Sequence, residues 1–292
     1  MKFPPQLLLI LATILWGGNF VIGRAVTGEI PPFTLAFLRW CLAFVVFFPI
    51  AFKQVKRDWT KFKEHWKIVL TLALTGVAAF NTLVYIGVYS TTSINASLMN
   101  STTPIFIYIL SFIFLKERLS KYQIIGTAIS ILGVIFILSG GSLESLHQFT
   151  FNKGDLIVII AVFCWSIYSL LVKQYADRLP GFSTFLVSIA IGALMLLPFT
   201  IYEQFTLESP ILWSAKTISA VFYVGILASI VAFLSWNHGV IQIGANRASI
   251  YLNFIPVFSA FFATIFLGEQ LQLAQVIGGL AVIGGVLLTN RK

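Results

Sequence analysis

Most of the chain consists of long apolar stretches, which are separated by short connections that contain proline, glycine and charged residues. A helix that crosses a membrane needs about 20 mainly apolar residues, and its backbone groups bond to one another inside the lipid. The sequence therefore predicts an all-α integral membrane protein with ten transmembrane helices. We expect these helices at residues 6–24, 33–52, 66–90, 93–115, 122–139, 155–173, 182–201, 213–240, 245–267 and 272–289.

The composition excludes a soluble protein. Hydrophobic residues make up 58% of the chain and charged residues 10%, whereas soluble domains carry about 25% charged residues. The net charge of +9 does not indicate a nucleic-acid partner, because no basic segment is interleaved with aromatic residues. Cys41 and Cys164 both lie in apolar segments, so we expect them to pack in the core. Neither a disulfide nor a metal site nor a cofactor is expected.

The basic residues fall mainly into alternate connections. With both termini in the cytoplasm, 15 of the 19 Lys and Arg residues lie in predicted cytoplasmic segments. The predicted outer segments hold only Arg24, Lys153 and Lys216, and Arg39 lies within a predicted helix. Cytoplasmic loops of membrane proteins carry an excess of Lys and Arg. The sequence therefore predicts a multi-pass protein of the plasma membrane with cytoplasmic N- and C-termini.

The chain contains an internal repeat. Residues 114–134 and 266–286 are identical at ten of 21 paired positions, with an offset of 152. Near the start of each half, Trp16 recurs as Trp165 at an offset of 149. Each half holds five predicted helices, an odd number, so the second half must enter the membrane from the opposite side. The expected domains are a first repeat at 1–139, an extracellular linker at 140–154 and a second repeat at 155–292.

The basic residues of the repeated segment agree with this inversion. Three of them are replaced in the second copy, where Lys116, Arg118 and Lys121 become Gly268, Gln270 and Leu273. Only a copy that faces the cytoplasm is expected to keep basic residues. Two inverted five-helix repeats can exchange conformations, so that a site between them opens to one side and then to the other. This is the geometry of a secondary transporter.

Several motifs resemble one known family across nearly the whole chain. They are WGGNFVIGR near the start, FLRWCLAF in the second predicted helix, ASLMNSTTPIF and ASIYLNFIPVF in the fourth and ninth, and the pair KERLSKYQIIG and GEQLQLAQVIGG. These motifs are similar to those of EamA-type transporters of the drug/metabolite transporter superfamily. The resemblance implies two inverted five-helix repeats around a central cavity, which helices one to four and six to nine line or flank, with helices five and ten at the periphery. It also implies transport of amino acids, other metabolites or toxic compounds, often outward.

Polar and aromatic residues recur on equivalent faces of the predicted helices, and we expect them to line the cavity. A polar group in hydrocarbon is costly unless it is paired or hydrated. The alternative is that these side chains only form hydrogen bonds between helices, worth about 0.6 kcal/mol on average in a membrane. The symmetric pairing of the positions favours a cavity wall. The expected lining residues are Trp16, Asn19, Asn81, Tyr85, Asn100, Trp165, Tyr168, Asn237, His238 and Asn253.

Pro104 and Pro256 occupy equivalent positions in the fourth and ninth predicted helices. Proline removes a backbone hydrogen bond and kinks a helix, while nearby hydroxyl groups can satisfy the freed carbonyls. Two static kinks are one interpretation. A pair of hinges that bend in opposite phases is the other, and we favour it because both halves contain the proline.

Two basic residues within the predicted helices each have two interpretations. Arg39 either extends outward or bonds helix-end carbonyls, which is the favoured role, or it is a counter-charge for an anionic group of the substrate. His238 either packs at a helix end, which is the favoured role, or takes part in coupling transport to a proton. Glu117 and Glu269 lie at helix ends, where we expect them to cap or orient the following turn.

Glycines recur every seven residues in the fifth and tenth predicted helices. Gly126 and Gly133 in the first half correspond to Gly278 and Gly285 in the second half. Such strips of small residues allow helices to pack closely in a membrane. Packing within a monomer is the expected role, and formation of a homodimer is the alternative.

The sequence favours a secondary transporter that exports amino acids or amphipathic metabolites by alternating access. Uptake by the same fold is one alternative, and a channel is the other. A channel would need a repeated filter or a charged ring, which we do not find. An enzyme is not expected, because GxSxG and HExxH motifs are absent and the three histidines lie on different segments. The expected partners are a small-molecule substrate and the lipid bilayer, with a proton as the candidate coupling ion.

Overall fold

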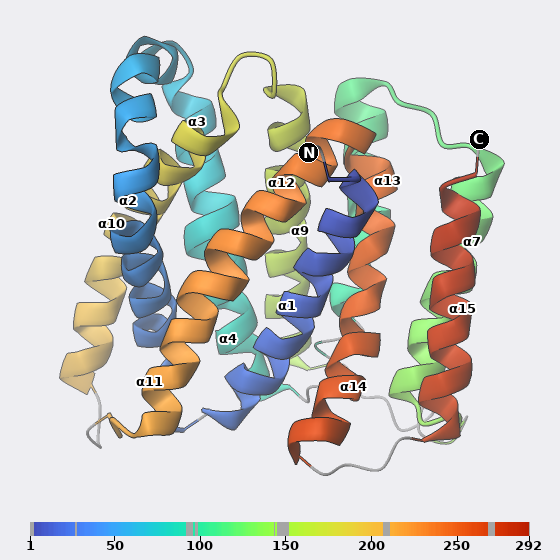
Figure 1. The fold of residues 1–292 in the computed structure, drawn as a ribbon. Coiled ribbons are helices and arrows are strands. Elements are labelled where there is room, and N and C mark those ends of the chain that lie inside the picture. The colour runs from blue at the N-terminus through green and yellow to red at the C-terminus, as the bar shows by residue number, and fades with distance from the viewer. Residues whose placement is uncertain are drawn as a thin grey trace.

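The structure is a computed structural model that describes residues 3–26, 28–91, 96, 99–142, 144, 152–206, 211–267 and 272–291. Every regular element in these residues is a helix, and most of the helices run side by side in one bundle (Figure 1). The two ends of the chain lie at the same end of this bundle (Figure 1). We call it the terminal end, and we call the opposite end the distal end.

Each half of the chain contains a series of helices. The first half contains α1 (Pro5–Ala25), α2 (Pro32–Glu64), α3 (Trp66–Leu72), η1 (Ala73–Ala79), α4 (Phe80–Ser90), α6 (Thr103–Leu110), η2 (Ser111–Leu115) and α7 (Lys121–Leu138). The second half contains α9 (Lys153–Gln174), α10 (Gly181–Thr206), α11 (Ala215–Phe222), η3 (Tyr223–Val231), α12 (Ala232–Ile243), α13 (Ala245–Ser249), η4 (Ile250–Asn253), α14 (Phe254–Leu267) and α15 (Leu273–Thr289). The π-helical segments η1 and η3 each continue directly into the α-helix that follows.

The helices have the length and composition of membrane spans. Within the described residues, eight helical segments are long and apolar enough to cross a membrane, and two shorter apolar helices cover Thr103–Leu115 and Leu273–Thr289. Large apolar side chains are exposed on the bundle, among them Leu132, Leu194 and Leu287. Exposure of such apolar surface to water is unfavourable. Lipid chains around the bundle would cover these side chains instead. The chain is therefore an integral membrane protein.

Some helices continue beyond the predicted boundaries of the apolar segments. α2 extends to Glu64, although we expected the helix to end at residue 52. Lys, Arg, Gln and Glu are good helix formers, so the basic segment that follows the apolar one stays helical. α9 begins at Lys153, inside the expected linker, because Asn152 and Asp155 form a capping box there.

α2 and α10 pack against each other in antiparallel directions. Near the start of α2, the backbone N–H groups of Phe33 and Thr34 donate to the carboxylate of Glu203, over 3.1 and 2.7 Å. Near the start of α10, the hydroxyl of Ser183 donates to Asp58 over 2.7 Å. The beginning of each helix therefore lies beside the later part of the other. A carboxylate near a helix N-terminus also stabilises the helix dipole.

The first helix of each half packs mainly against helices of the other half. α1 packs against α12 and α14, and α9 packs against α4 and α6. Glycine allows the close approach in both cases. A Cβ atom on Gly87 would lie 2.6 Å from the Val158 side chain, and one on Gly239 would lie 2.5 Å from the Leu9 side chain. The two halves are thus interlocked and share one core.

α7 and α15 form a separate close pair within the monomer. A Cβ atom on Gly133 would lie 2.7 Å from the carbonyl oxygen of Gly278, and one on Gly126 would lie 2.6 Å from that of Gly285. Side chains at these positions would therefore collide with the backbone of the partner helix. The strip of small residues packs inside the monomer, which was the first of the two expected roles.

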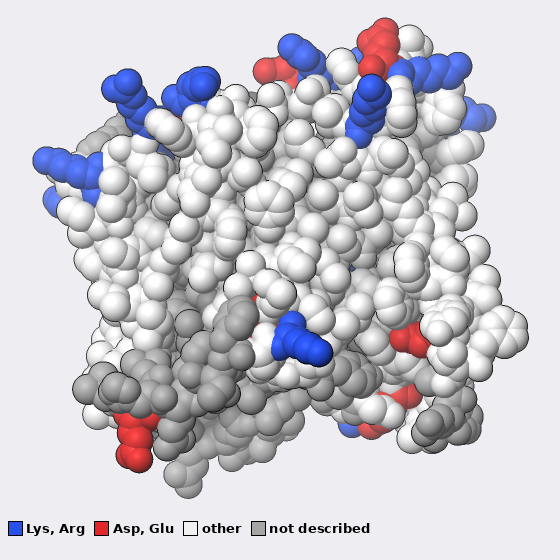
Figure 2. All heavy atoms as spheres, turned by 180° about the vertical axis from the view of Figure 1, so that it is seen from behind, with Lys and Arg blue, Asp and Glu red and all other residues white. Residues whose placement is uncertain are grey.

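The charged residues are distributed unevenly between the two ends. Figure 2 shows that most of the Lys and Arg side chains visible in that view lie at the terminal end. α2 contributes Lys61 and Lys63 from its last turn, and α13 contributes Arg247. The long apolar middle of the molecule separates these residues from the distal end.

Replacement of Gly133 by alanine tests the packing of α7 on α15. We expect Gly133→Ala to lower the free energy of unfolding by about 1–3 kcal/mol, because overpacking forces the two backbones apart. Gly284→Ala is the matched control, since nothing lies within 4 Å of a Cβ atom at that position of α15. Thermal unfolding of the purified protein in detergent would measure both effects. Equal midpoints for the two variants would contradict the close approach.

Candidate functional site

Aromatic side chains from both halves meet at the centre of the bundle. Trp16 of α1 and Trp165 of α9 are equivalent positions, and their rings meet edge to face with centroids 5.2 Å apart. Both rings also contact Phe233 of α12, with centroids 5.7 and 5.2 Å away. Trp236 lies 5.6 Å from Trp16. We call Trp16, Trp165, Phe233 and Trp236 the central aromatic cluster.

A first cavity lies on the distal side of this cluster. Side chains of α1, α4, α9, η4 and α14 line it, so both halves contribute to its wall. Its volume is about 30 Å³, which corresponds to roughly two water molecules. A larger solute therefore requires the surrounding helices to move apart. Six of the predicted residues line this cavity, namely Trp16, Asn19, Asn81, Tyr85, Asn100 and Trp165.

A second cavity lies on the terminal side of the cluster, between α9, α10 and α12. It also has a volume of about 30 Å³. Two predicted residues line it, and they are bonded to each other: the hydroxyl of Tyr168 lies 3.0 Å from Asn237 Oδ1 and 2.8 Å from Nδ2. This pair joins α9 to α12. Eight of the ten predicted lining residues therefore surround the two cavities.

The structure does not place the other two predicted residues at either cavity. His238 is exposed on the surface of α12, because it follows Asn237 by one residue and a helix turns by about 100° per residue. Asn253 is buried in η4, but its amide donates to the Ser130 hydroxyl over 2.9 Å and so links η4 to α7. For these two positions the expectation of a cavity wall was wrong.

Arg39 is fully buried and points into the bundle. Its Nη1 donates to Asn81 Oδ1 over 2.9 Å and to the Tyr85 hydroxyl over 3.1 Å. Its Nη2 donates to the backbone carbonyl of Ala228 over 3.0 Å, and its Nε donates to Ser229 Oγ. The favoured expectation, outward extension or bonds to helix-end carbonyls, was wrong, because the carbonyl that Arg39 reaches lies within η3.

The two residues that Arg39 contacts in the second half, Ala228 and Ser229, lie in the π-helical segment η3. The Ser229 hydroxyl donates to the carbonyl of Val224, five residues earlier. The carbonyl of Ala228 accepts from Trp16 Nε1 over 2.9 Å as well as from Arg39. π-bulges often occur at functional sites. Neither Ala228 nor Ser229 was predicted from the sequence, although a serine within an apolar segment is a usable signal.

Both predicted hinge prolines lie in the first turn of a helix and do not kink the middle of one. Pro104 is the second residue of α6 and follows a turn at residues 101–102. Pro256 is the third residue of α14 and follows the 3-10 segment η4. Proline is well tolerated in the first turn, because the N–H groups there have no helical partner. The turn at residues 101–102 and the 3-10 segment η4 interrupt the helices, and each comes before its proline in the sequence.

Glu117 does not cap the helix that follows it. Ser120 and Gln123 form the capping box of α7, and Glu117 accepts a hydrogen bond of 2.8 Å from Asn246 of α13. The contact joins the two halves at the terminal end. The corresponding residue Glu269 lies outside the described residues.

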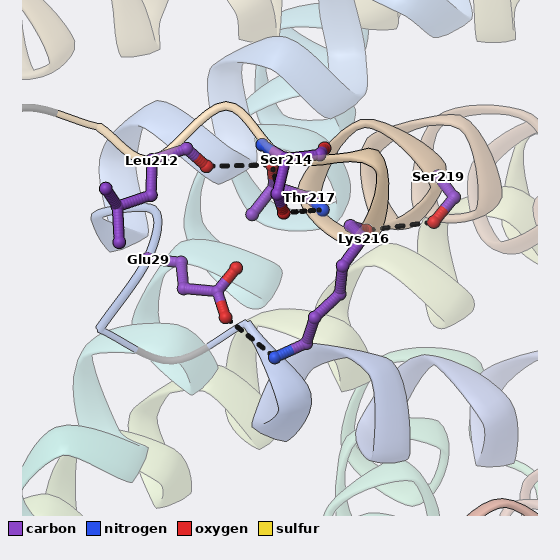
Figure 3. Close-up of polar contacts among 6 residues, drawn as sticks. All are labelled: Glu29, Leu212, Ser214, Lys216, Thr217 and Ser219. Atoms are coloured by element: carbon purple, nitrogen blue, oxygen red, sulfur yellow. Dashed lines mark hydrogen bonds and ion pairs between the residues drawn. The ribbon is translucent and has the colours of Figure 1, made fainter.

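The two halves also meet at the distal end, where Figure 3 shows the contacts around Glu29. Lys216, near the start of α11, pairs with Glu29 over a distance of 2.7 Å (Figure 3). The backbone N–H of Leu212 donates to the carbonyl of Glu29 over 3.3 Å. Ser214 and Thr217 form a capping box that begins α11. The segment before α2 is thus tied to the start of α11.

The described residues contain no group of three or more His, Cys, Asp or Glu side chains that could hold a metal ion. The polar groups at the two cavities are amides, phenols, hydroxyls and indoles, together with the guanidinium behind Asn81 and Tyr85. Such groups bind a solute through hydrogen bonds and aromatic contacts.

Known proteins resemble this chain over most of its length. An uncharacterized transporter of Archaeoglobus fulgidus is 29% identical, over 100% of this chain and 99% of that protein. The uncharacterized transporter YyaM of Bacillus subtilis is 26% identical, over 97% of this chain and 92% of that protein. A probable terminal-alkyne amino-acid exporter of Streptantibioticus cattleyicolor is 28% identical, over 75% of this chain and 71% of that protein.

One solved crystal structure superimposes with a TM-score of 0.78 at 19% identity, and covers 99% of this chain and 97% of that one. This likeness shows a shared fold. The family model described as the EamA-like transporter family matches residues 4–139 and again residues 152–291. The family and the relatives are transporters and not enzymes. Because the model matches both halves of the sequence, the chain belongs to the EamA-like transporter family.

Proposed function

We propose that the protein is a secondary transporter that moves small metabolites across the plasma membrane by alternating access. In this proposal, ten membrane-crossing helices form two inverted five-helix repeats. The observation that carries it is the first cavity, which lies beside the central aromatic cluster and is lined by side chains of both halves. A site at the interface of two repeats can open to either side when the repeats move against each other.

The packing supports the inversion. Thr34 and Ser183 are equivalent positions, and each donates a hydrogen bond to a carboxylate in the later part of the other helix, Glu203 of α10 or Asp58 of α2. The exchange of contacts between α1 and α9 supports it as well. Both ends of the chain lie at the basic end of the bundle, and the positive-inside rule assigns that end to the cytoplasm.

The cavity chemistry favours small amphipathic or zwitterionic solutes. Amide and phenol groups supply hydrogen bonds, and tryptophan and phenylalanine rings supply apolar surface. We propose export of amino acids or related metabolites, since the family resemblance favours outward transport and one relative is named an amino-acid exporter. A carrier also fits better than a channel, because neither described cavity exceeds about 30 Å³.

Counterflow in proteoliposomes tests the transport mechanism. We expect vesicles that contain the purified protein and an unlabelled L-amino acid to accumulate the same radiolabelled amino acid transiently, with a rate that saturates. The panel would contain small, branched and aromatic L-amino acids, and vesicles without protein are the control. Flux that never saturates, or no exchange with any compound, would contradict a carrier.

Cysteine labelling tests the inversion. Ser120 and Gln272 are equivalent exposed residues that cap the N-termini of α7 and α15. Cys41 and Cys164 would first be replaced by alanine, and Ser120→Cys and Gln272→Cys would then be made separately. We expect a membrane-impermeant thiol reagent applied to intact cells to label Gln272→Cys and to label Ser120→Cys only after lysis. The same accessibility for both cysteines would rule out inverted repeats.

Replacement of His238 tests its part in proton coupling. Because His238 is exposed and lies at neither cavity, we expect His238→Gln to leave the pH dependence of counterflow unchanged. The initial rate would be measured between pH 5.5 and 8 for both proteins, at about half a unit per step, across the range in which histidine titrates. A flattened profile in the variant would show instead that His238 carries the coupling proton.

A further inference from the structure

Three polar atoms on residues that line the first cavity have no hydrogen-bond partner within the described part of the chain. They are Asn19 Oδ1, Asn81 Nδ2 and Trp165 Nε1, and all three side chains line the first cavity. The residues are more than nine-tenths buried, with 8%, 6% and 1% of their surface exposed. A buried polar atom without a hydrogen bond costs about 1–3 kcal/mol. A ligand that enters the cavity can supply the missing partners.

Arg39 determines which donors of Asn81 and Tyr85 remain available to a ligand. A guanidinium can only donate hydrogen bonds, so the atom of Asn81 that contacts Arg39 must be Oδ1, and Nδ2 remains a free donor. The Tyr85 hydroxyl accepts from Arg39 over 3.1 Å, so its own proton is available for an acceptor. Together with Trp165 Nε1, the residues that line the cavity therefore offer three donors.

The charge of Arg39 has no anionic partner among the described residues. The ion pairs found there involve Arg57, Lys61 and Lys216, whereas the partners of Arg39 are neutral. Its guanidinium also lies 5.2 Å from the ring centre of Trp40. A buried charge that lacks a counter-charge is expensive, and it favours an anion nearby.

We propose that the first cavity binds the carboxylate group of the substrate. Asn81 Nδ2, Tyr85 Oη and Trp165 Nε1 donate to the carboxylate, and Arg39 acts behind them as a positioning residue that supplies positive charge. Asn19 Oδ1 is the acceptor for a protonated amine of the same molecule. The substrate class is thus small amino acids and related carboxylates. The inference rests on the proposed function, because the cavity must widen in another conformation of the transport cycle.

Replacement of Asn81 by aspartate is the most direct test. The aspartate keeps the bond to Arg39, but it removes the donor and adds a negative charge that neutralises the guanidinium. We expect the variant to unfold at the same temperature as the wild type or higher, and its half-saturation concentration for amino-acid counterflow to rise at least tenfold. Asn290→Asp, at the end of α15, is the matched control and should leave counterflow unchanged.

Replacement of Tyr85 by phenylalanine gives a second test that does not depend on the first variant. It removes one donor and keeps the ring, so we expect the half-saturation concentration to rise severalfold with the maximal rate less affected. Tyr202→Phe is the control, because Tyr202 is 71% exposed near the end of α10. Unchanged half-saturation in both Asn81→Asp and Tyr85→Phe would overturn the proposal.

The ligand chemistry is tested with matched compounds. Each L-amino acid of the panel would compete as the free acid, as its carboxamide, as the decarboxylated amine and as the aminophosphonate analogue. We expect only the free acids to compete well with the labelled amino acid. If the amides or amines compete equally, or the phosphonates compete better, the carboxylate site is wrong while the transporter assignment stands. Absence of saturable exchange with every compound would instead remove the proposed function, and this inference with it.

Discussion

The buried guanidinium of Arg39 is the interaction on which the centre of the structure depends. A charge within a membrane protein is tolerated only when its hydrogen bonds are satisfied inside the protein. Arg39 meets this requirement through Asn81, Tyr85, Ala228 and Ser229, which belong to α4 and η3. These partners come from both halves of the chain. The position of η3 relative to α2 and α4, and hence the shape of the first cavity, follows from this contact.

The two halves share their packing but differ in their polar chemistry. In the second half, Tyr168 and Asn237 are hydrogen-bonded to each other. At the equivalent positions of the first half, Tyr85 is bonded by Arg39, and Asn19 has an unpaired oxygen. The residue equivalent to Arg39 in the second half is a serine. The charge at the first cavity therefore comes from one half of the chain only, so the two halves need not contribute equally to substrate recognition.

Much of the helical arrangement was predictable, because apolar segments and matching motifs are local features of the chain. Eight of the ten expected lining residues also lie at the two cavities, since the spacing of residues along a helix predicts which side chains share a face. His238 and Asn253 failed this test. His238 follows Asn237 by one residue and therefore faces away from it, and Asn253 lies in the 3-10 segment η4, which interrupts the helix expected at 245–267. The extent of α2 beyond residue 52 was also missed, because helix-forming charged residues continue it outside the apolar segment.

The sequence by itself determined that the chain is a membrane protein of apolar helices with a repeated pattern. The length of each apolar stretch and the spacing of the repeat are local properties that can be read along the chain. Only the tertiary structure decided the partners of Arg39, since Ser229 lies 190 residues away in sequence and approaches it through the π-helical turn of η3. It also decided that the glycines of α7 face those of α15. The physical reason is that side-chain contacts depend on the depth and rotation of helices against one another, which periodicity leaves open.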